Sequence, residues 1–164
     1  WMRANAESYN IDPNKIGALG ASAGAHLVAL LDTTGEIPEL EGTGGNPNFS
    51  SKVQAVFSIA TPVFGPSTSP ERISMFGLSE EEFHLLSPYH NTDQSSAPIF
   101  LLHGTEDEIV PPENAQEMYD KYKKLGLNVK LEWVLGRGHG FYEGRDFAIS
   151  RAAEFFISQL TRQN

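Results

Sequence analysis

Residues Lys15-Ile16-Gly17-Ala18-Leu19-Gly20-Ala21-Ser22-Ala23-Gly24 decide the fold, because a Gly-x-Ser-x-Gly pattern follows directly on a short apolar run. The next stretch, Ala25 to Leu31, has the composition of a helix. A strand, a sharp turn and a helix form the setting in which this pattern has chemical meaning. Small residues around the turn let strand and helix approach closely. The sequence therefore predicts Ser22 lifted above the sheet, with the Ala23 N–H facing a developing anion.

Two later segments also end an apolar run in a loop. Residues Pro98 to His103 lead into Gly104-Thr105-Glu106-Asp107. Residues Val129 to Leu135 lead into Gly136-Arg137-Gly138-His139. Ligand sites of open parallel sheets lie beyond the carboxyl ends of the strands. We therefore expect Asp107 and His139 to come near Ser22.

The chain order Ser22, Asp107, His139 predicts nucleophilic catalysis. A free serine hydroxyl is a weak nucleophile at neutral pH, and a histidine can take its proton while a carboxylate fixes the histidine tautomer. Nucleophile, acid, base is the chain order of α/β-hydrolases. Glu106 and Glu108 flank Asp107 and are alternatives for the acid. The alternative for Ser22 is a serine that only caps a tight turn.

These segments together resemble α/β-hydrolases of the carbohydrate-esterase and acylesterase type, related to acetylxylan, feruloyl and kynurenine-formamidase-like enzymes. The residues that carry the resemblance are Gly20 to Leu27, Ser87-Pro88, His103 to Pro111 and Gly138 to Phe141. The resemblance implies a serine hydrolase that cleaves carboxylic esters, acyl groups on carbohydrate among them, through an acyl-enzyme. No cofactor is implied. The alternatives are an amidase or peptidase on the same triad, and a non-catalytic fragment or interaction module.

The resemblance also predicts what this chain does not carry. Such enzymes begin with several more strands, and a His-Gly-Gly-type loop there supplies the second half of the oxyanion hole. No such segment precedes Ser22, and Gly42 to Gly45 read as a surface loop. The chain opens with Trp1-Met2, so we expect the C-terminal portion of the full domain, lacking the N-terminal strands. Alone, it is expected to be a poor catalyst.

Further site residues are expected around this centre. We predict substrate contacts from His26, Val110 and Phe141, and His103 is expected to bond to backbone at its strand end. No metal site is expected, because the triad already accounts for the histidine and carboxylate positions.

Composition narrows the function classes. The 164 residues carry a net charge of −9, which argues against a nucleic-acid partner. No apolar run is long enough to span a bilayer. The absence of cysteine excludes a disulfide framework and leaves the compartment open. The length suits a single domain, residues 1–164.

Alternating strands and helices predict an α/β fold with a parallel sheet of about four strands and helices on both faces. Helices are expected near the beginning, within 71–86, after Pro112, and over 146–160, the last burying Ile149, Ala153, Phe156 and Leu160. Residues 32–51 and 87–97 read as loops. Lys15 to Gly20 would be an edge strand, so we expect association with a second copy or with an N-terminal half.

Overall fold

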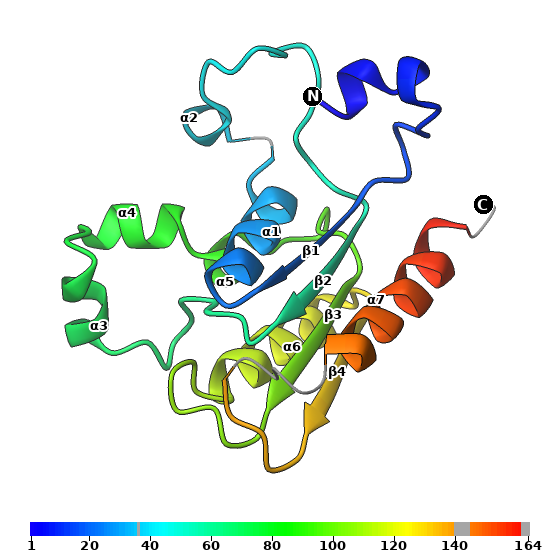
Figure 1. Ribbon diagram of the computed structural model, residues 1–164. Helices are drawn as coiled ribbons and strands as arrows, with labels where there is room; N and C mark the ends of the chain where they lie inside the picture. Colours follow the sequence, from blue (N-terminus) through cyan, green and yellow to red (C-terminus); the bar gives the residue numbers. More distant parts are fainter. Residues whose placement is uncertain (36, 140–144, 162–164) are drawn as a thin grey trace.

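The computed structural model describes residues 1–35, 37–139 and 145–161 and contains one parallel sheet of four strands (Figure 1). The strands lie side by side in chain order, which confirms the predicted fold class. Their bounds are β1 Gly17–Ala21, β2 Ala55–Ile59, β3 Ile99–Gly104 and β4 Val129–Val134.

The register aligns the carboxyl ends of the strands at one edge of the sheet. Ala21 lies opposite Ile59, and Gly104 lies opposite Val134. Every residue of β2 and β3 is buried, because neighbours flank these strands on both sides and helices cover them. The loops that leave β1, β3 and β4 therefore start close together.

Nine helical segments lie within the described residues. Two are 3-10 turns, η1 Arg3–Asn5 and η2 Glu7–Tyr9, where the sequence predicted an α-helix. The others are α1 Ala23–Thr33, α2 Pro38–Glu41, α3 Pro70–Met75, α4 Glu80–Leu85, α5 Pro88–Asn91, α6 Glu113–Leu125 and α7 Arg145–Leu160. The short helices α2 and α5 interrupt segments that were expected to be loops. Each begins with proline, whose fixed φ suits the first helical turn.

The core has two layers, one on each face of the sheet. On one face Phe57 and Phe100 pack against Phe155 of α7, with ring centroids 6.2 and 5.6 Å from it. On the other face Val56 and Leu101 pack with Met118 and Tyr122 of α6, and Val28 of α1 joins them. Figure 1 shows α7 and α6 on opposite sides of the strands. This arrangement confirms helices on both faces.

The buried face of α7 differs from the predicted one. Ala148, Ala152 and Phe155 are buried, while Ile149 is 62% exposed and Ala153 is exposed. Phe156 and Leu160 pack at the margin of the core. The helix carries two adjacent apolar stripes, so its periodicity allowed either to face inward. The contact of Phe155 with the rings on β2 and β3 turns the stripe of Ala148, Ala152 and Phe155 inward.

Helix ends follow the local sequence signals. Ser79 and Glu82 form a capping box at the start of α4, and Gly126 ends α6 with φ of 73°. Among the described residues, no helix is long and apolar enough to cross a bilayer.

Candidate active site

Ser22 lies at the turn between β1 and α1 in a strained backbone conformation. Its φ and ψ are 53° and −123°, a region that residues other than glycine rarely occupy. The Ser22 N–H donates to the Ile59 carbonyl over 2.8 Å, and the Ser22 carbonyl accepts from the His26 N–H over 3.1 Å. Strain of this kind costs about 1–3 kcal/mol and persists only where the surroundings impose it. The predicted elbow is therefore present.

The two glycines of the pattern are not equivalent. A Cβ at Gly20 would lie 2.2 Å from the Gly24 carbonyl oxygen and 2.7 Å from the Ala25 nitrogen. No side chain fits there, because strand and helix backbones meet at this point. A Cβ at Gly24 would meet nothing within 4 Å. Close approach therefore requires glycine only at Gly20.

A second close approach joins the loops after β3 and β4. A Cβ at Gly104 would lie 2.2 Å from the Arg137 carbonyl oxygen. That same carbonyl accepts from the Glu106 N–H over 2.9 Å. The Gly136 N–H donates to Thr105 Oγ1, also over 2.9 Å. These contacts hold the loop that carries His139 against the loop that carries Asp107.

The imidazole of His139 bridges Ser22 and Asp107. Its Nε2 lies 2.8 Å from Ser22 Oγ, and its Nδ1 lies 2.8 Å from Asp107 Oδ2. A carboxylate only accepts, so Nδ1 carries the hydrogen in the neutral ring and Nε2 accepts from the serine hydroxyl. This is the geometry that activates a serine nucleophile.

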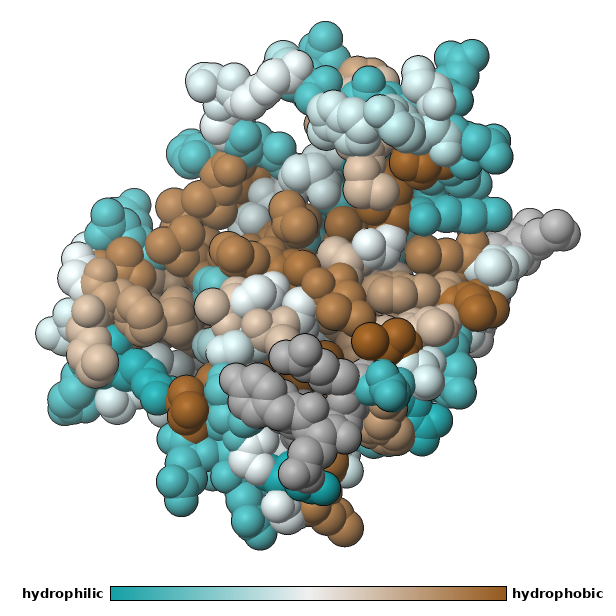
Figure 2. All heavy atoms as spheres, in the orientation of Figure 1, coloured by the Kyte–Doolittle hydropathy of each residue, from teal (hydrophilic) through white to brown (hydrophobic). Residues whose placement is uncertain are grey.

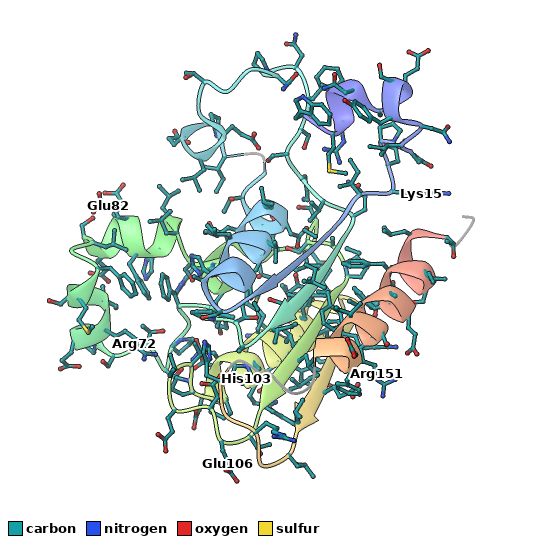
Figure 3. All side chains as sticks on the ribbon, viewed as in Figure 1. Lys15, Arg72, Glu82, His103, Glu106 and Arg151 are labelled. Atoms are coloured by element: carbon teal, nitrogen blue, oxygen red, sulfur yellow. The ribbon has the colours of Figure 1, made fainter. Side chains whose placement is uncertain are left out.

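Burial separates Asp107 from its two neighbours. Asp107 is 3% exposed, whereas Glu106 and Glu108 are exposed. Figure 3 shows Glu106 pointing outward from the loop beyond β3. Asp107 Oδ1 accepts from the N–H groups of Ile109 and Val110 over 3.0 and 2.9 Å. Both carboxylate oxygens are thus occupied, and only Asp107 faces His139.

His26 supports the wall of the site beside Ser22. Its Nδ1 lies 2.9 Å from the Pro62 carbonyl oxygen, and its ring lies 4.6 Å from the Phe64 ring. Burial lowers the pKa of His26, and the Pro62 carbonyl opposes part of that shift. The neutral ring therefore ties the first turn of α1 to the segment after β2.

Phe64 belongs to an aromatic cluster that periodicity did not predict. Its φ is 52°, an outlier for a bulky residue, and its ring lies 5.4 Å from Phe76 and 5.2 Å from Phe83. The Ser87 hydroxyl donates to the Phe64 carbonyl over 2.9 Å and holds the backbone there. No local spacing links these residues, which come from a loop and from the neighbourhood of α3, α4 and α5.

The segment that leads from Phe64 into α3 also contacts the loop that carries Asp107. Arg72 Nη2 donates to the Ile109 carbonyl over 2.8 Å, and Figure 3 shows Arg72 extending from α3. The segment from Phe64 to Arg72 thus contacts both the Ser22 helix and the Asp107 loop. Sequence reasoning did not identify Arg72 as a support of the site.

Three further residues were predicted to belong to the site: Ala23, Val110 and Phe141. Ala23 is the first residue of α1 and directly follows Ser22. Val110 is 4% exposed, so its backbone contacts Asp107 while its side chain faces the interior; a substrate contact from it stays a prediction. Phe141 lies outside the described residues. Within the part of the chain that the structure describes, no three His, Cys, Asp or Glu side chains gather as a metal-binding group.

Comparison with curated proteins finds esterases. The chain is 26% identical to the esterase LipC of Mycobacterium tuberculosis, over 99% of this chain and 44% of LipC. It is 26% identical to an acetylxylan esterase of Xylanibacter ruminicola, over 89% of this chain and 30% of that protein. The chain thus spans less than half the length of these two relatives.

Solved structures give the same fold. A truncated carbohydrate esterase from gut microbiota superposes with a TM-score of 0.83 and 27% identity, over 98% of this chain and 65% of that one. The propionate-bound esterase Est2 of Thermogutta terrifontis gives 0.82 and 27% identity, over 100% of this chain and 64% of its own. The superposition covers the whole described sheet with its flanking helices.

Two family models together match the entire chain. A model described as TAP-like protein matches residues 83–164. The model described as BD-FAE matches residues 1–122, about three quarters of the chain, and includes the Ser22 turn and Asp107. With the fold and the esterase structures that superpose on it, this match shows that the chain belongs to the BD-FAE family of α/β-hydrolases.

Proposed function

We propose that this protein is a carboxylic ester hydrolase that works through an acyl-enzyme on Ser22. The observation that carries the proposal is the unbroken contact from Ser22 Oγ through His139 to Asp107, at 2.8 Å on both sides of the imidazole. The esterase names of the relatives support an ester as the substrate class.

Acylation is the first step. His139 Nε2 takes the hydroxyl proton as Ser22 Oγ attacks the ester carbonyl carbon. The tetrahedral intermediate collapses, the bond to the leaving alcohol breaks, and the imidazolium returns its proton to that alcohol. Asp107 keeps the ring in the productive tautomer and stabilises its positive charge.

Deacylation repeats the sequence with water. His139 removes a proton from the water molecule that attacks the acyl-enzyme. The carboxylic acid leaves, and the proton returns to Ser22 Oγ. In both steps the negative carbonyl oxygen accepts a hydrogen bond from the Ala23 N–H, at the N-terminus of α1. The Ala23 N–H is the one oxyanion donor assigned in this chain.

Acyl groups on carbohydrate are the proposed natural esters. The support is the acetylxylan esterase among the relatives and the carbohydrate esterase among the superposed structures. His26, Val110 and Phe141 remain the proposed substrate contacts, of which His26 lies closest in sequence to the nucleophile.

Covalent labelling tests the proposal. A fluorophosphonate probe should modify Ser22, as mapped by mass spectrometry, and should not modify the Ser22→Ala variant. Ser22→Ala should also abolish hydrolysis of p-nitrophenyl acetate, while the exposed-site control Ser95→Ala should leave both signals intact. An adduct on another serine, or none at all, would contradict the proposal.

Release of acetate from acetylated xylo-oligosaccharides tests the substrate class separately. We expect Ser22-dependent release. Hydrolysis of the chromogenic ester without any release from the oligosaccharide would leave the enzyme an esterase but remove carbohydrate as its substrate.

A further inference from the structure

His103 is a buried imidazole that the proposed reaction does not use. It lies near the carboxyl end of β3 and is 1% exposed. Its ring packs edge-on against Trp133, its partner in the sheet register, at 6.1 Å between centroids. A buried polar ring needs hydrogen-bond partners, and the partner of His103 Nε2 lies in the loop that carries Asp107.

The contacts of His103 indicate which ring nitrogen carries the hydrogen. Nε2 lies 2.9 Å from the Val110 carbonyl oxygen, which only accepts, so Nε2 carries the hydrogen. Burial lowers the pKa of His103, although the Val110 carbonyl and the Asp107 carboxylate oppose that shift. The ring is therefore a neutral donor that faces the loop.

The same donor lies beside the carboxylate that orients His139. His103 Nε2 is 3.5 Å from Asp107 Oδ2, the oxygen that accepts from His139 Nδ1 over 2.8 Å. The other oxygen, Oδ1, accepts from the Val110 N–H over 2.9 Å. The Val110 residue is thus held on both sides, by His103 through its carbonyl and by Asp107 through its N–H.

We propose that His103 is a positioning residue of the active site, which fixes the Asp107 carboxylate through Val110 and thereby sets the orientation of His139. The inference rests on the proposed function. Without the imidazole donor, the Val110 carbonyl would be buried and unpaired, and the turn from Asp107 to Val110 would shift. A carboxylate displaced by about 1 Å costs on the order of 10²-fold in rate, because the base is then misaligned.

A pair of variants separates positioning from packing. His103→Gln keeps an N–H donor with a similar reach, whereas His103→Leu keeps only apolar volume. For His103→Leu we expect kcat to fall about 10- to 100-fold, because the displaced Asp107 misaligns the base, with a smaller change in KM from the shifted Val110. For His103→Gln we expect kcat within about threefold of the wild type. Equal losses in both variants, or a change in KM alone, would overturn the inference.

Labelling distinguishes this inference from the proposed function. The wild type should react with the fluorophosphonate at Ser22, and His103→Leu should react about 10- to 100-fold more slowly while His103→Gln reacts almost normally. No reaction at Ser22 of the wild type would overturn both. Reaction of the wild type and His103→Leu at equal rates would overturn only the role of His103.

The wild-type protein offers a test that does not depend on folding of a variant. In a ¹⁵N-resolved NMR spectrum of the imidazoles, His103 should be neutral near neutral pH and protonated at Nε2. A ring protonated at Nδ1 alone could not donate to Val110 and would contradict the proposal.

Discussion

The side chains of Ser22 and His139 are 117 positions apart in the chain, yet their Oγ and Nε2 atoms lie 2.8 Å apart. Two backbone contacts without room for a side chain produce this meeting, one at Gly20 and the other at Gly104. Both glycines lie at or near the end of a strand, where parallel topology gathers the loops.

The role of Asp107 can be separated from those of its acidic neighbours. Asp107→Asn should keep the shape of the loop but lower turnover by about 10⁴-fold, because an amide favours the wrong histidine tautomer. Glu106→Gln and Glu108→Gln are the matched controls and should change turnover little, since both side chains are exposed. Steady-state hydrolysis of a chromogenic ester measures all three, and a larger loss from either glutamine variant would reassign the acid.

Gly20 and Gly24 should respond oppositely to alanine. At Gly20 the new Cβ meets backbone atoms that cannot turn aside, so we expect a loss of about 1–3 kcal/mol in the free energy of unfolding. At Gly24 the space is open and the residue is helical, so alanine should add about 0.5–1 kcal/mol. Urea unfolding measures both. A neutral Gly20→Ala would show that strand and helix can separate at the elbow.

Asp32 should make stability depend on pH. It is buried at the end of α1, where it accepts from the Ala97 N–H over 2.8 Å and from the Tyr122 hydroxyl over 3.3 Å. Burial raises its pKa from 3.8 to about 6, although Ala97 and the charge of Lys52 oppose the shift and Asp93 adds to it. The unfolded chain therefore loses this proton first as pH rises.

The sign of the effect follows from that order of proton loss. The contribution of Asp32 is full below about pH 4 and is lost as pH rises to about 6, amounting to about 3 kcal/mol. Asp32→Asn lacks this titration, so the difference in unfolding free energy between wild type and variant should shrink by that amount over the interval. Urea denaturation at several pH values measures both proteins. If the unfolding free energies of wild type and Asp32→Asn changed in parallel with pH, the prediction would be refuted.

The edge of β1 has no strand partner among the described residues and should promote association of this chain. Leu19 on this strand is 47% exposed, and Leu27 of α1, with Ile149 and Ile157 of α7, is more than 60% exposed. Figure 2 shows apolar side chains gathered across this face. The N-terminal turns leave Leu19 of this strand exposed, and Arg3 ties them to the carbonyls of Pro13, Ser50 and Lys52.

We propose pairing with a second copy through this edge. An unpaired strand with apolar surface beside it invites another strand, and salt should strengthen the contact by screening the net charge of −9 on each chain. Sedimentation equilibrium should show dimers for the wild type and for the control Met75→Lys, whose side chain lies on α3. Ile149→Lys with Ile157→Lys should be monomeric. A wild type that stays monomeric at every concentration would remove the proposal.

The sequence by itself determined the elements that carry the site. A strand before Ser22, apolar runs before Asp107 and His139, and the chain order of these three residues are local features. The structure confirms the strands, and it brings the three side chains into contact. Local signals suffice there because the run of apolar residues and the glycines at its end act on the same few residues.

Only the tertiary structure decided which apolar stripe of α7 faces the sheet and what surrounds the site. The periodicity of α7 fits two stripes, and contact of Phe155 with Phe57 and Phe100 selects between them. The support of Asp107 by His103, and the placement of Phe64 against His26, join residues through space. Such contacts leave no periodic pattern in the sequence, because burial and hydrogen bonding depend on which surfaces the completed fold brings together.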